Sequence, residues 1–454
     1  MNHNYQPIIG MEIHVELKTV SKMFCGCKND PFYAPKPNIY ICPVCLGFPG
    51  TLPVPNRKAV EWTIMLGLAL NCTIPKLSKF DRKNYFYPDL PKGYQISQYD
   101  QPIATHGSLK IKDQISKIKN EKEKIIGIQR VHLEEDTGKL LHETVHGKPV
   151  TLVDFNRSGV PLVEIVTEPD IHSAEEAKTF LKKLHQVIRY LEISDADMEK
   201  GSMRLEPNIS VGRESGSVNK ETLPPYKVEV KNINSFKFVK KAIDYEVDRH
   251  IGILERGETP VQETRGWDEK KGITLPQRRK EGAEDYRYFP EPDIPPMRWS
   301  ADFIESLRQK LSELPEDKFT RFTAEYQLAD QDIVRLIESR ELADFFEKAV
   351  SSAKGKVTPK DLANWLLNRN VDITKNSSEE LVRRVLNAKA MVHVDEAELM
   401  KIIKKVITAN PKAVSDFKSG KTGSIMFLLG QVLRGLKGKG DPQAIIKMLK
   451  SLLK

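Results

Sequence analysis

The sequence predicts an α+β protein, with strands and helices over residues 1–294 and helices alone after them. In the first part, segments that alternate polar and apolar residues are separated by well-patterned amphipathic helices. A cluster of prolines at positions 290–296 follows, and every periodic segment beyond it has the spacing of a helix. A chain of 454 residues is long enough for several separate cores.

The first alternating segment, residues 8–17, carries the most informative pattern. In an extended strand, Glu12, His14 and Glu16 point to one face, and the residues between them are apolar. Carboxylate, imidazole and carboxylate at two-residue steps are ligand groups for a divalent cation. Taken alone, the pattern also fits a sheet with one solvated face.

Two later strands repeat this pattern with charges of both signs. Residues 203–211 alternate Arg204, Glu206 and Asn208 with apolar side chains, and residues 227–232 place lysines and a glutamate at alternate positions. A site for a nucleotide and its metal needs anions for the cation and cations for the phosphates. A solvated sheet face is again the alternative.

Charged segments between these strands add candidates. Residues 113–124 are charged and predict the tip of a hairpin, and the strand that starts at residue 126 ends in Glu134, Glu135 and Asp136. Three adjacent carboxylates are costly unless water or a cation neutralises them.

Residues 80–98 mix Arg, Lys and Asn with aromatic side chains between prolines. This composition predicts a surface loop that presents side chains to a ligand. The alternative is an aromatic loop that packs on its own domain.

Four of the five cysteines form two close pairs, Cys25 with Cys27 and Cys42 with Cys45. In a reducing compartment such pairs predict a structural zinc site, because four thiolates complete a tetrahedron. A metal would also stabilise the proline-rich loop around them. The fifth, Cys72, follows a helical run and is expected to be a small core residue.

The net charge of +9 is concentrated at the C-terminal end. Residues 401–454 hold twelve Lys or Arg against two Asp, which sums to +10 and leaves about −1 for the first 400 residues. A basic terminal unit suits a polyanion such as RNA, although it could simply be solubilising. The chain shows neither a signal peptide nor a long apolar run, so we expect a cytoplasmic protein without a membrane contact.

Helix signals are clear in both parts of the chain. Ser173 and Glu176 form a capping box in front of an amphipathic helix, and Asn56 caps an earlier one. The remaining helices are predicted at residues 236–255, 300–311, 330–337, 341–350, 359–367, 377–388, 396–407, 424–436 and 441–454.

Several blocks resemble the B subunit of the aspartyl/glutamyl-tRNA amidotransferases, and the resemblance runs from Ile8 to the C-terminus. The blocks are residues 11–17 (MEIHVEL), 80–89 (FDRKNYFYPD), 94–98 (YQISQ), 132–138 (HLEEDTG), 164–170 (EIVTEPD), 231–236 (KNINSF), 263–265 (ETR) and 285–293 (DYRYFPEPD). The resemblance implies a cradle domain with an antiparallel sheet over residues 1–294, with a zinc knuckle at 25–45. A helical domain at 295–394 and a small basic tRNA-binding domain at 395–454 would follow.

The resemblance also implies an activity. The family uses ATP to phosphorylate the side-chain carboxylate of Glu on Glu-tRNA(Gln), or of Asp on Asp-tRNA(Asn), and ammonia then displaces the phosphate. The ammonia comes from an amidase A subunit, and a small C subunit completes a heterotrimer. The chain would therefore be a ligase subunit that binds mischarged tRNA, ATP, Mg²⁺ and a structural Zn²⁺.

Site residues follow from the family's motifs. Glu12, His14 and Glu135 match the magnesium ligands and are the expected catalytic residues, and the four paired cysteines match the family's zinc ligands. The residues assigned to substrate and nucleotide binding are Arg82, Lys83, Arg204, Glu206, Asn208, Lys231 and Asn232.

One segment departs from the family pattern. Arg204-Leu-Glu-Pro-Asn208 stands where the family usually has Arg-Cys-Asp-Ala-Asn, so Glu206 is longer by one methylene and Pro207 lacks a backbone donor.

Two other functions are alternatives. A P-loop is disfavoured because Ser415 replaces the first glycine before Ser419-Gly-Lys-Thr422. A non-catalytic, zinc-containing tRNA-binding subunit is the second alternative.

Overall fold

The computed structural model describes residues 5–112, 123–213, 223–279, 286–369, 371–392, 396–436 and 440–453. The chain divides into two compact units, Met1–Pro315 and Glu316–Lys454. Strands and helices are mixed in the first unit, whereas the described residues of the second form helices only. The α+β class is therefore confirmed. The predicted division after residues 294 and 394 stays a prediction, and residues 393–395 lie outside the described part.

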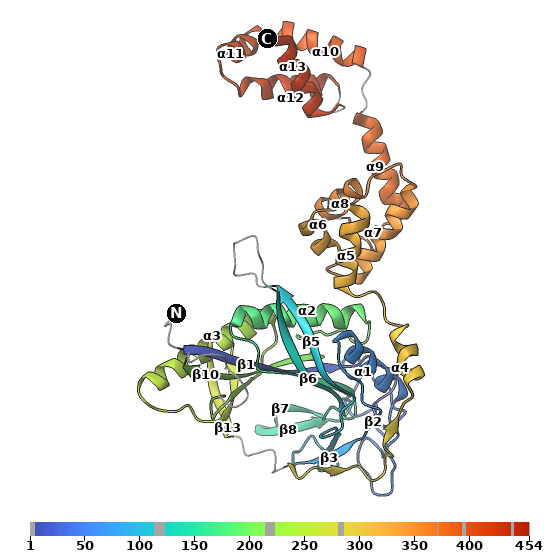
Figure 1. Ribbon diagram of the computed structural model, residues 1–454, viewed down its shortest axis with the longest axis vertical. Coiled ribbons are helices and arrows are strands. Elements are labelled where there is room, and N and C mark those ends of the chain that lie inside the picture. The colour runs from blue at the N-terminus through green and yellow to red at the C-terminus, as the bar shows by residue number, and fades with distance from the viewer. Residues whose placement is uncertain are drawn as a thin grey trace. The chain divides into compact units, whose positions relative to one another are not determined.

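An eight-stranded sheet forms the centre of the first unit (Figure 1). Its order is β13-β12-β11-β10-β1-β9-β6-β5, and all neighbours are antiparallel except β11 and β12. The strands are β1 (Tyr5–Glu16), β5 (Ala104–Lys112), β6 (Glu123–Glu135), β9 (Pro161–Thr167), β10 (Met203–Arg213), β11 (Val228–Lys231), β12 (Glu263–Asp268) and β13 (Ile273–Arg279). The first strand of the chain thus lies inside the sheet, where both its edges are paired.

Within the described residues, three small sheets accompany the large one. They are formed by β3 (Asp81–Asn84) with β4 (Tyr94–Ser97) and β14 (Phe289–Pro290), by β2 (Leu77–Ser78) with β15 (Met297–Arg298), and by β7 (Lys139–Val145) with β8 (Lys148–Asp154). Part of the expected surface loop at residues 80–98 is therefore an antiparallel pair, and the expectation of a simple loop was wrong there. The charged and aromatic residues of this segment give no regular alternation, so the sequence pattern did not indicate the strands. Tertiary pairing decided them: β3 pairs with the nearby β4 on one edge and with the distant β14 on the other.

The predicted hairpin between β5 and β6 is consistent with their antiparallel pairing, which runs to Lys112 and Glu123. Of the residues expected at its tip, 113–124, residues 113–122 lie outside the described residues, and Glu123 and Lys124 already belong to β6.

The helices largely follow the predicted segments. They are α1 (Arg57–Ala69), α2 (Ala174–Tyr190), α3 (Phe236–Glu255), α4 (Ala301–Arg308), α5 (Pro315–Tyr326), α6 (Asp330–Leu336), α7 (Arg340–Ala353), α8 (Pro359–Asn368), α9 (Ser378–Val392), α10 (Glu396–Ala409), α11 (Pro411–Lys418), α12 (Ser424–Gly435) and α13 (Pro442–Leu453). The predicted caps are present: Asn56 accepts from the backbone of Lys58 and Ala59, and Ser173 from that of Glu176. Helices α5 and α11 were not predicted.

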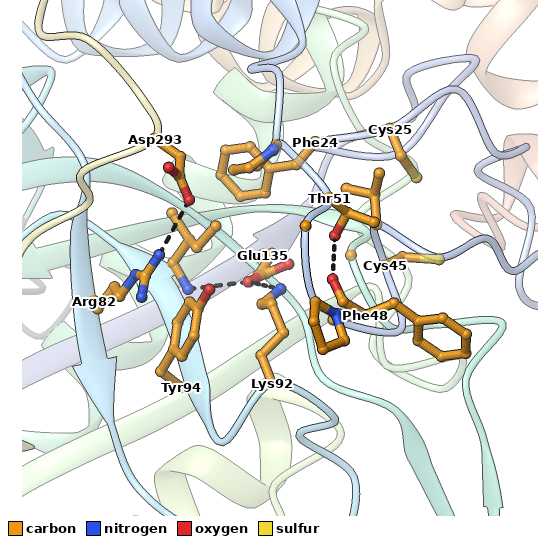
Figure 2. Close-up of a pocket in the computed structure, with 17 residues that line it drawn as sticks. Phe24, Cys25, Cys45, Phe48, Thr51, Arg82, Lys92, Tyr94, Glu135 and Asp293 are labelled. Carbon is orange, nitrogen blue, oxygen red and sulfur yellow. Dashed lines mark hydrogen bonds and ion pairs between the residues drawn. The ribbon is translucent and has the colours of Figure 1, made fainter.

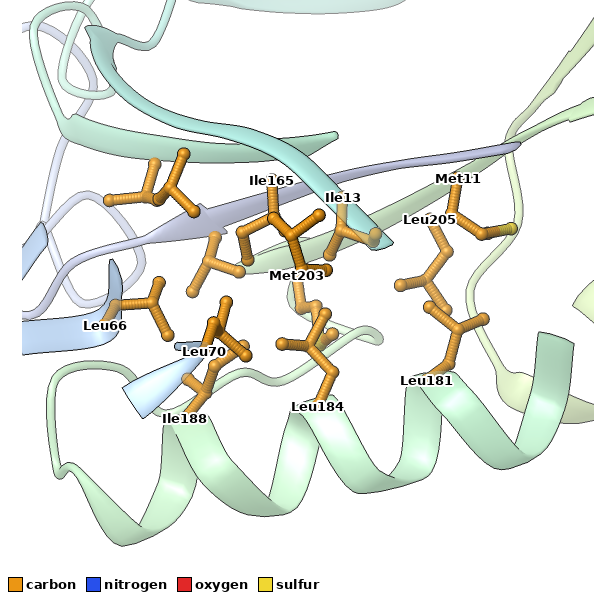
Figure 3. Packing of buried hydrophobic residues seen from close by; sticks show 14 of the residues in the cluster. Met11, Ile13, Leu66, Leu70, Ile165, Leu181, Leu184, Ile188, Met203 and Leu205 are labelled. Atoms are coloured by element: carbon orange, nitrogen blue, oxygen red, sulfur yellow. The ribbon is translucent and has the colours of Figure 1, made fainter. Parts of the chain in front are cut away.

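One face of the large sheet is apolar and packs against α2 (Figure 3). Met11 and Ile13 of β1 are fully buried there, and Leu181, Leu184 and Ile188 project from α2 into the same hydrophobic cluster. The alternation predicted for β1 is confirmed, and it fixes which face of the strand is left for polar chemistry.

The described residues of the second unit form two separate hydrophobic clusters. One joins helices α5 to α9 around Phe322 and Phe346, and the other joins α10, α12 and α13 around Leu428 and Leu449. The P-loop-like residues 419–422 lie between α11 and α12, without a strand before them. This helical setting agrees with the rejection of a P-loop.

Candidate functional site

The polar face of the large sheet gathers charged residues from five neighbouring strands. Residues that pair across antiparallel strands point to the same face. His14 of β1 pairs with Arg204 of β10 on one side and with Glu164 of β9 on the other, and Glu164 pairs with His132 of β6. The register of four strands therefore sets these four side chains in one row.

Two carboxylates bridge two histidines at the centre of this row. His14 Nε2 lies 3.3 Å from Glu164 Oε2 and 3.7 Å from Glu134 Oε1. His132 Nε2 lies 3.1 Å from Glu164 Oε2, and Ser97 Oγ donates to Glu134 Oε2 at 2.9 Å. Ligand atoms of His14, Glu134 and Glu164 all lie within 4.8 Å of one another, so these three residues could hold a metal ion. We call them the His14 cluster.

The electrostatics of the His14 cluster favour a positive charge at its centre. Burial disfavours the imidazolium, but the charge of Glu164 and its hydrogen bond, with Glu206 and Glu134, raise the pKa of His14 to about 9. Burial opposes the charged carboxylate of Glu164, yet the two histidines lower its pKa well below the usual range. A divalent cation would supply the positive charge that a proton supplies here, and it would take the neutral imidazole as a ligand.

A second group of carboxylates lies further along the same face. Oxygens of Glu12, Glu206 and Glu229 come within 4.8 Å of one another. Lys231 Nζ donates to Glu206 Oε2 at 2.9 Å, and Asn208 Nδ2 donates to Glu12 Oε1 at 2.9 Å. Burial opposes the ammonium of Lys231, but Glu206 and Glu229 raise its pKa. This second group thus already holds a cation of its own.

The Glu206-Pro207 departure leaves the sheet intact. Pro207 pairs with Met11 of β1, and the pairing of β10 with β11 covers only Asn208 and Ile209. Proline therefore occupies a position next to the place where one ladder begins, which is where a strand tolerates it. Glu206 still faces Lys231, so its carboxylate remains part of the polar face.

Near the C-terminal end of β1, the polar face carries a charged group around Asp136. Arg204 Nη2 donates to Asp136 Oδ2 at 2.5 Å, and Arg157 Nε lies 3.7 Å from the same oxygen. Burial, together with the nearby charge of Asp136, raises the pKa of Glu16 to about 8. Glu16, the third polar residue of β1, thus lies where burial and Asp136 favour its protonated form.

The structure does not bring Glu135 to His14. Adjacent residues of a strand point to opposite faces, so Glu134 joins the His14 cluster and Glu135 turns away from it. Glu135 Oε1 accepts from the backbone of Ile96 at 3.0 Å and lies 2.5 Å from Lys92 Nζ. The expected trio of Glu12, His14 and Glu135 therefore needs correction, because its members lie in three different places on two faces of the sheet.

Glu135 instead lines a cavity of about 210 Å³ beside the cysteine loop (Figure 2). Arg82 lines the same cavity and donates to Glu291 through Nε and Nη2, at 2.7 and 2.8 Å. Its neighbour Lys83 faces the other way, where Glu134 and Glu164 help to raise its pKa although burial opposes the charge. The adjacent residues Arg82 and Lys83 are thus divided between the cavity and the polar face.

The other expected binding residues are also divided. Arg204, Glu206, Asn208 and Lys231 lie on the polar face. Asn232 has φ of 63°, a left-handed conformation that asparagine tolerates, and it lines a shallow pocket with residues 266–270 of β12 and the following turn.

The four paired cysteines do come together. Their sulfur atoms all lie within 4.8 Å of one another, so Cys25, Cys27, Cys42 and Cys45 could hold a metal ion. The hydrogen bond from Cys25 lowers the pKa of Cys45 to about 5, against the effect of burial, and the charge of Lys22 helps. Cys72 lies apart from them, buried in the core, as expected.

Sequence reasoning missed Glu164 and His132 as members of the polar face, whereas Glu229 stands in the alternating segment 227–232 that the sequence did single out. Glu164 lies in the apolar strand β9, whose sequence PLVEIVT gives no alternating pattern. A lone carboxylate inside an otherwise apolar strand was the available signal, because burying it is costly without a partner.

Comparison with known protein families identifies the class of protein to which the chain belongs. Residues 7–305 match the family described as the GatB/GatE catalytic domain, and residues 371–453 match the GatB domain. The sheet with its polar face therefore lies within the residues that match this catalytic-domain family.

The curated relatives are more specific. Proteins from Caldanaerobacter subterraneus subsp. tengcongensis, Thermotoga sp. strain RQ2 and Thermomicrobium roseum are 45%, 44% and 46% identical to the chain, and each match covers 99% of both sequences. Each is named as the B subunit of an aspartyl/glutamyl-tRNA(Asn/Gln) amidotransferase. This chain belongs to that family, which confirms the predicted resemblance and the prediction of an enzyme subunit of the ligase type. None of the described helices combines the length and apolar character needed to cross a membrane.

Proposed function

We propose that the chain activates the side-chain carboxylate of a mischarged tRNA, Glu-tRNA(Gln) or Asp-tRNA(Asn), by phosphoryl transfer from ATP. The observation that carries this proposal is the His14 cluster, in which one imidazole and two carboxylates from three strands face a common point in a chain of this family. Such a cluster on rigid strands suits a reaction that depends on positioning and charge neutralisation.

The proposed chemistry needs activation before amidation. A free carboxylate is a poor acyl electrophile, because an oxide would have to leave. Transfer of the terminal phosphoryl group of ATP to a carboxylate oxygen gives an acyl phosphate and ADP. Ammonia then attacks the acyl carbon, the C–O bond to phosphate breaks, and the products are the amide, inorganic phosphate and a proton.

The residues that would hold magnesium are His14, Glu134 and Glu164, in place of the set expected from the sequence. The donor set fits a cation, because the carboxylates already attract a proton to His14. A magnesium ion bound there would neutralise negative charge on the phosphates.

Three cations of the chain are placed to bind anionic parts of the substrates. Lys83 lies near the carboxylates of the His14 cluster, and Arg204 and Lys231 lie on the same sheet face with about a third of each side chain exposed, 32% and 36%. We assign them to phosphate and carboxylate binding, since charge-assisted hydrogen bonds from fixed donors stabilise developing negative charge.

The test uses the reconstituted complex and a Glu164→Gln variant, with Glu143→Gln in the exposed strand β7 as the matched control. We expect Glu164→Gln to lower tRNA-dependent release of ADP by about 100- to 1000-fold while tRNA affinity is kept, and Glu143→Gln to behave as wild type. Full activity of Glu164→Gln would refute the cluster as the reaction centre. Loss of tRNA affinity with unchanged ADP release per bound tRNA would favour the non-catalytic tRNA-binding subunit.

Partners and compartment complete the proposal. The relatives are named as B subunits, and we propose that this chain likewise acts in a cytoplasmic heterotrimer with an amidase A subunit and a small C subunit. The ammonia would come from the amidase subunit. Assay of both mischarged tRNAs, with glutamine and then with ammonium, would identify the substrate; activity with glutamine and no partner would contradict the need for an amidase.

We further propose that the basic C-terminal residues 395–454 bind tRNA. Helices α10 to α13 have their own hydrophobic cluster, and residues 401–454 carry a net charge of +10. Removal of residues 395–454 should lower tRNA affinity by at least about tenfold at physiological salt and reduce its salt dependence. Replacing Lys139 and Lys148 of the β7–β8 pair by Gln is the control for charge loss alone. Unchanged affinity of the truncated chain would refute this assignment.

A further inference from the structure

A buried lysine, Lys22, lies next to Cys45 of the cysteine cluster. The side chain of Lys22 is fully buried, at 0% exposure. Its Nζ donates to the carbonyl of Tyr40 at 2.7 Å, to the carbonyl of Phe155 at 3.2 Å and to Cys45 Sγ at 3.9 Å. An ammonium group has three N–H donors, and these three acceptors use all of them.

The charge of Lys22 requires a partner. A buried ammonium without a counter-ion is strongly destabilising, because it loses its hydration. In the described part of the chain, the hydrogen-bond partners of its Nζ are two carbonyls and one sulfur, and it forms no ion pair with a carboxylate. The carbonyls offer dipoles only. The sulfur of Cys45 is therefore the group that can carry the balancing negative charge.

We propose that Lys22 is the counter-ion of a tetrathiolate zinc centre formed by Cys25, Cys27, Cys42 and Cys45. Four thiolates and Zn²⁺ together carry a charge of −2, and the ammonium reduces this to −1 on the side of the cluster where Cys45 and Lys22 are buried. Lys22 thus favours the deprotonated, metal-bound state of the cysteines over the free thiols. This role is separate from the proposed carboxylate activation, and it can fail while that activity stands.

Lys22 also positions the loop relative to the sheet. Its backbone N–H donates to the carbonyl of Cys27 at 3.0 Å, which fixes the turn carrying the first cysteine pair. Ser158 Oγ donates to the carbonyl of Cys45 at 3.2 Å, and Gly159 N–H donates to the carbonyl of Asp136 at 2.9 Å. The metal centre is therefore joined through one lysine and a short turn to the end of β6.

The test compares two lysine substitutions on the full chain. Lys22→Met removes the buried charge and keeps an unbranched side chain that is shorter by one atom, whereas Lys28→Met removes a lysine beside Cys27 whose side chain is 56% exposed. We expect Lys22→Met to weaken zinc binding by about 10- to 100-fold in competition with a chromophoric chelator. Lys28→Met should bind zinc as wild type does. Equal zinc affinity of Lys22→Met and wild type would overturn the proposal.

A second measurement uses the wild-type chain, so it does not depend on the folding of a variant. An amine-acylating reagent is applied with zinc bound and after removal of zinc by chelation, and modified lysines are identified by mass spectrometry. Lys22 should resist acylation with zinc bound and react at least tenfold faster without it, whereas Lys28 should react equally in both states. Equal reactivity of Lys22 in both states would show that its burial does not depend on the metal, and would overturn the proposal.

Discussion

The cysteine cluster and the His14 cluster are two candidate metal sites in one unit, and they are built in opposite ways. All four cysteines lie within residues 25–45 of one loop, whereas His14, Glu134 and Glu164 come from three strands far apart in the chain. The loop site has little regular structure, and we expect its order to depend on a bound metal and on Lys22. The strand site is held by the register of the sheet whether or not a cation is bound.

The largest effect on activity is expected at the strand site, where Glu134 and its neighbour Glu135 can be substituted separately. Glu134→Gln should lower tRNA-dependent ADP release by about 100- to 1000-fold, because it removes a carboxylate from the His14 cluster. Glu135→Gln is the matched control, since its side chain faces Lys92 and the cavity. Its activity should fall by about tenfold at most. The reverse order of the two activities would restore the ligand set expected from the sequence.

The loop site is tested by removal of its metal. Chelation should lower the free energy of unfolding of the first unit by about 3 kcal/mol or more, because the loop loses the interaction that orders it. Hydrogen exchange, read segment by segment, should show faster exchange at residues 22–55 and unchanged exchange in α5 to α9. Unchanged exchange in the loop would mean that hydrogen bonds alone order it.

A third charged group, around Glu246 of α3, is complete without any ligand. Arg249 Nη2 donates to Glu246 Oε2 at 2.7 Å, and Arg265 Nε lies 3.1 Å from Glu246 Oε1. Burial opposes its charge, but the hydrogen bonds from His250, Arg249 and Thr274 lower the pKa of Glu246 to about 2. It is therefore a reference for a buried carboxylate with a purely structural role.

The pH dependence of stability follows from this shift. A carboxyl group whose pKa is lower in the folded state stabilises the fold above its unfolded pKa of about 4.5, and this stabilisation is lost as pH falls toward about 2. Glu246→Gln should remove up to about 3 kcal/mol of the stabilisation that wild type loses as pH falls through this range. The half-exposed Asp244 on the same helix offers the control Asp244→Asn. Denaturant unfolding between pH 6 and pH 2 measures both, and equal slopes for wild type and Glu246→Gln would contradict the assignment.

The smallest expected effect is that of replacing Cys72, the cysteine outside the cluster of four. Burial raises the pKa of Cys72 to about 12, so it is a neutral core residue that packs against Gly107. Cys72→Ala should leave the bound zinc unchanged and lower the free energy of unfolding by about 1 kcal/mol. Metal analysis and denaturant titration measure the two quantities. A loss of zinc from Cys72→Ala would contradict the four-cysteine site.

The sequence predicted most of the helices and the central strands, because each has a period that a short window can read. It also predicted the cysteine site, whose ligands are close neighbours in the chain. It failed where a residue's role depends on a distant strand. The pairs Arg82 with Lys83 and Glu134 with Glu135 look alike as sequence, yet in each pair the two members serve opposite faces.

The sequence by itself determined the family, the α+β class, the apolar face of β1 and the four cysteines. Only the tertiary structure decided which carboxylates meet His14, because a shift of one residue in register moves a side chain to the other face of a sheet. The same is true of Lys22, which is an ordinary lysine in the sequence. Its burial beside Cys45, without a carboxylate among its contacts in the described residues, comes from three segments that fold together around it.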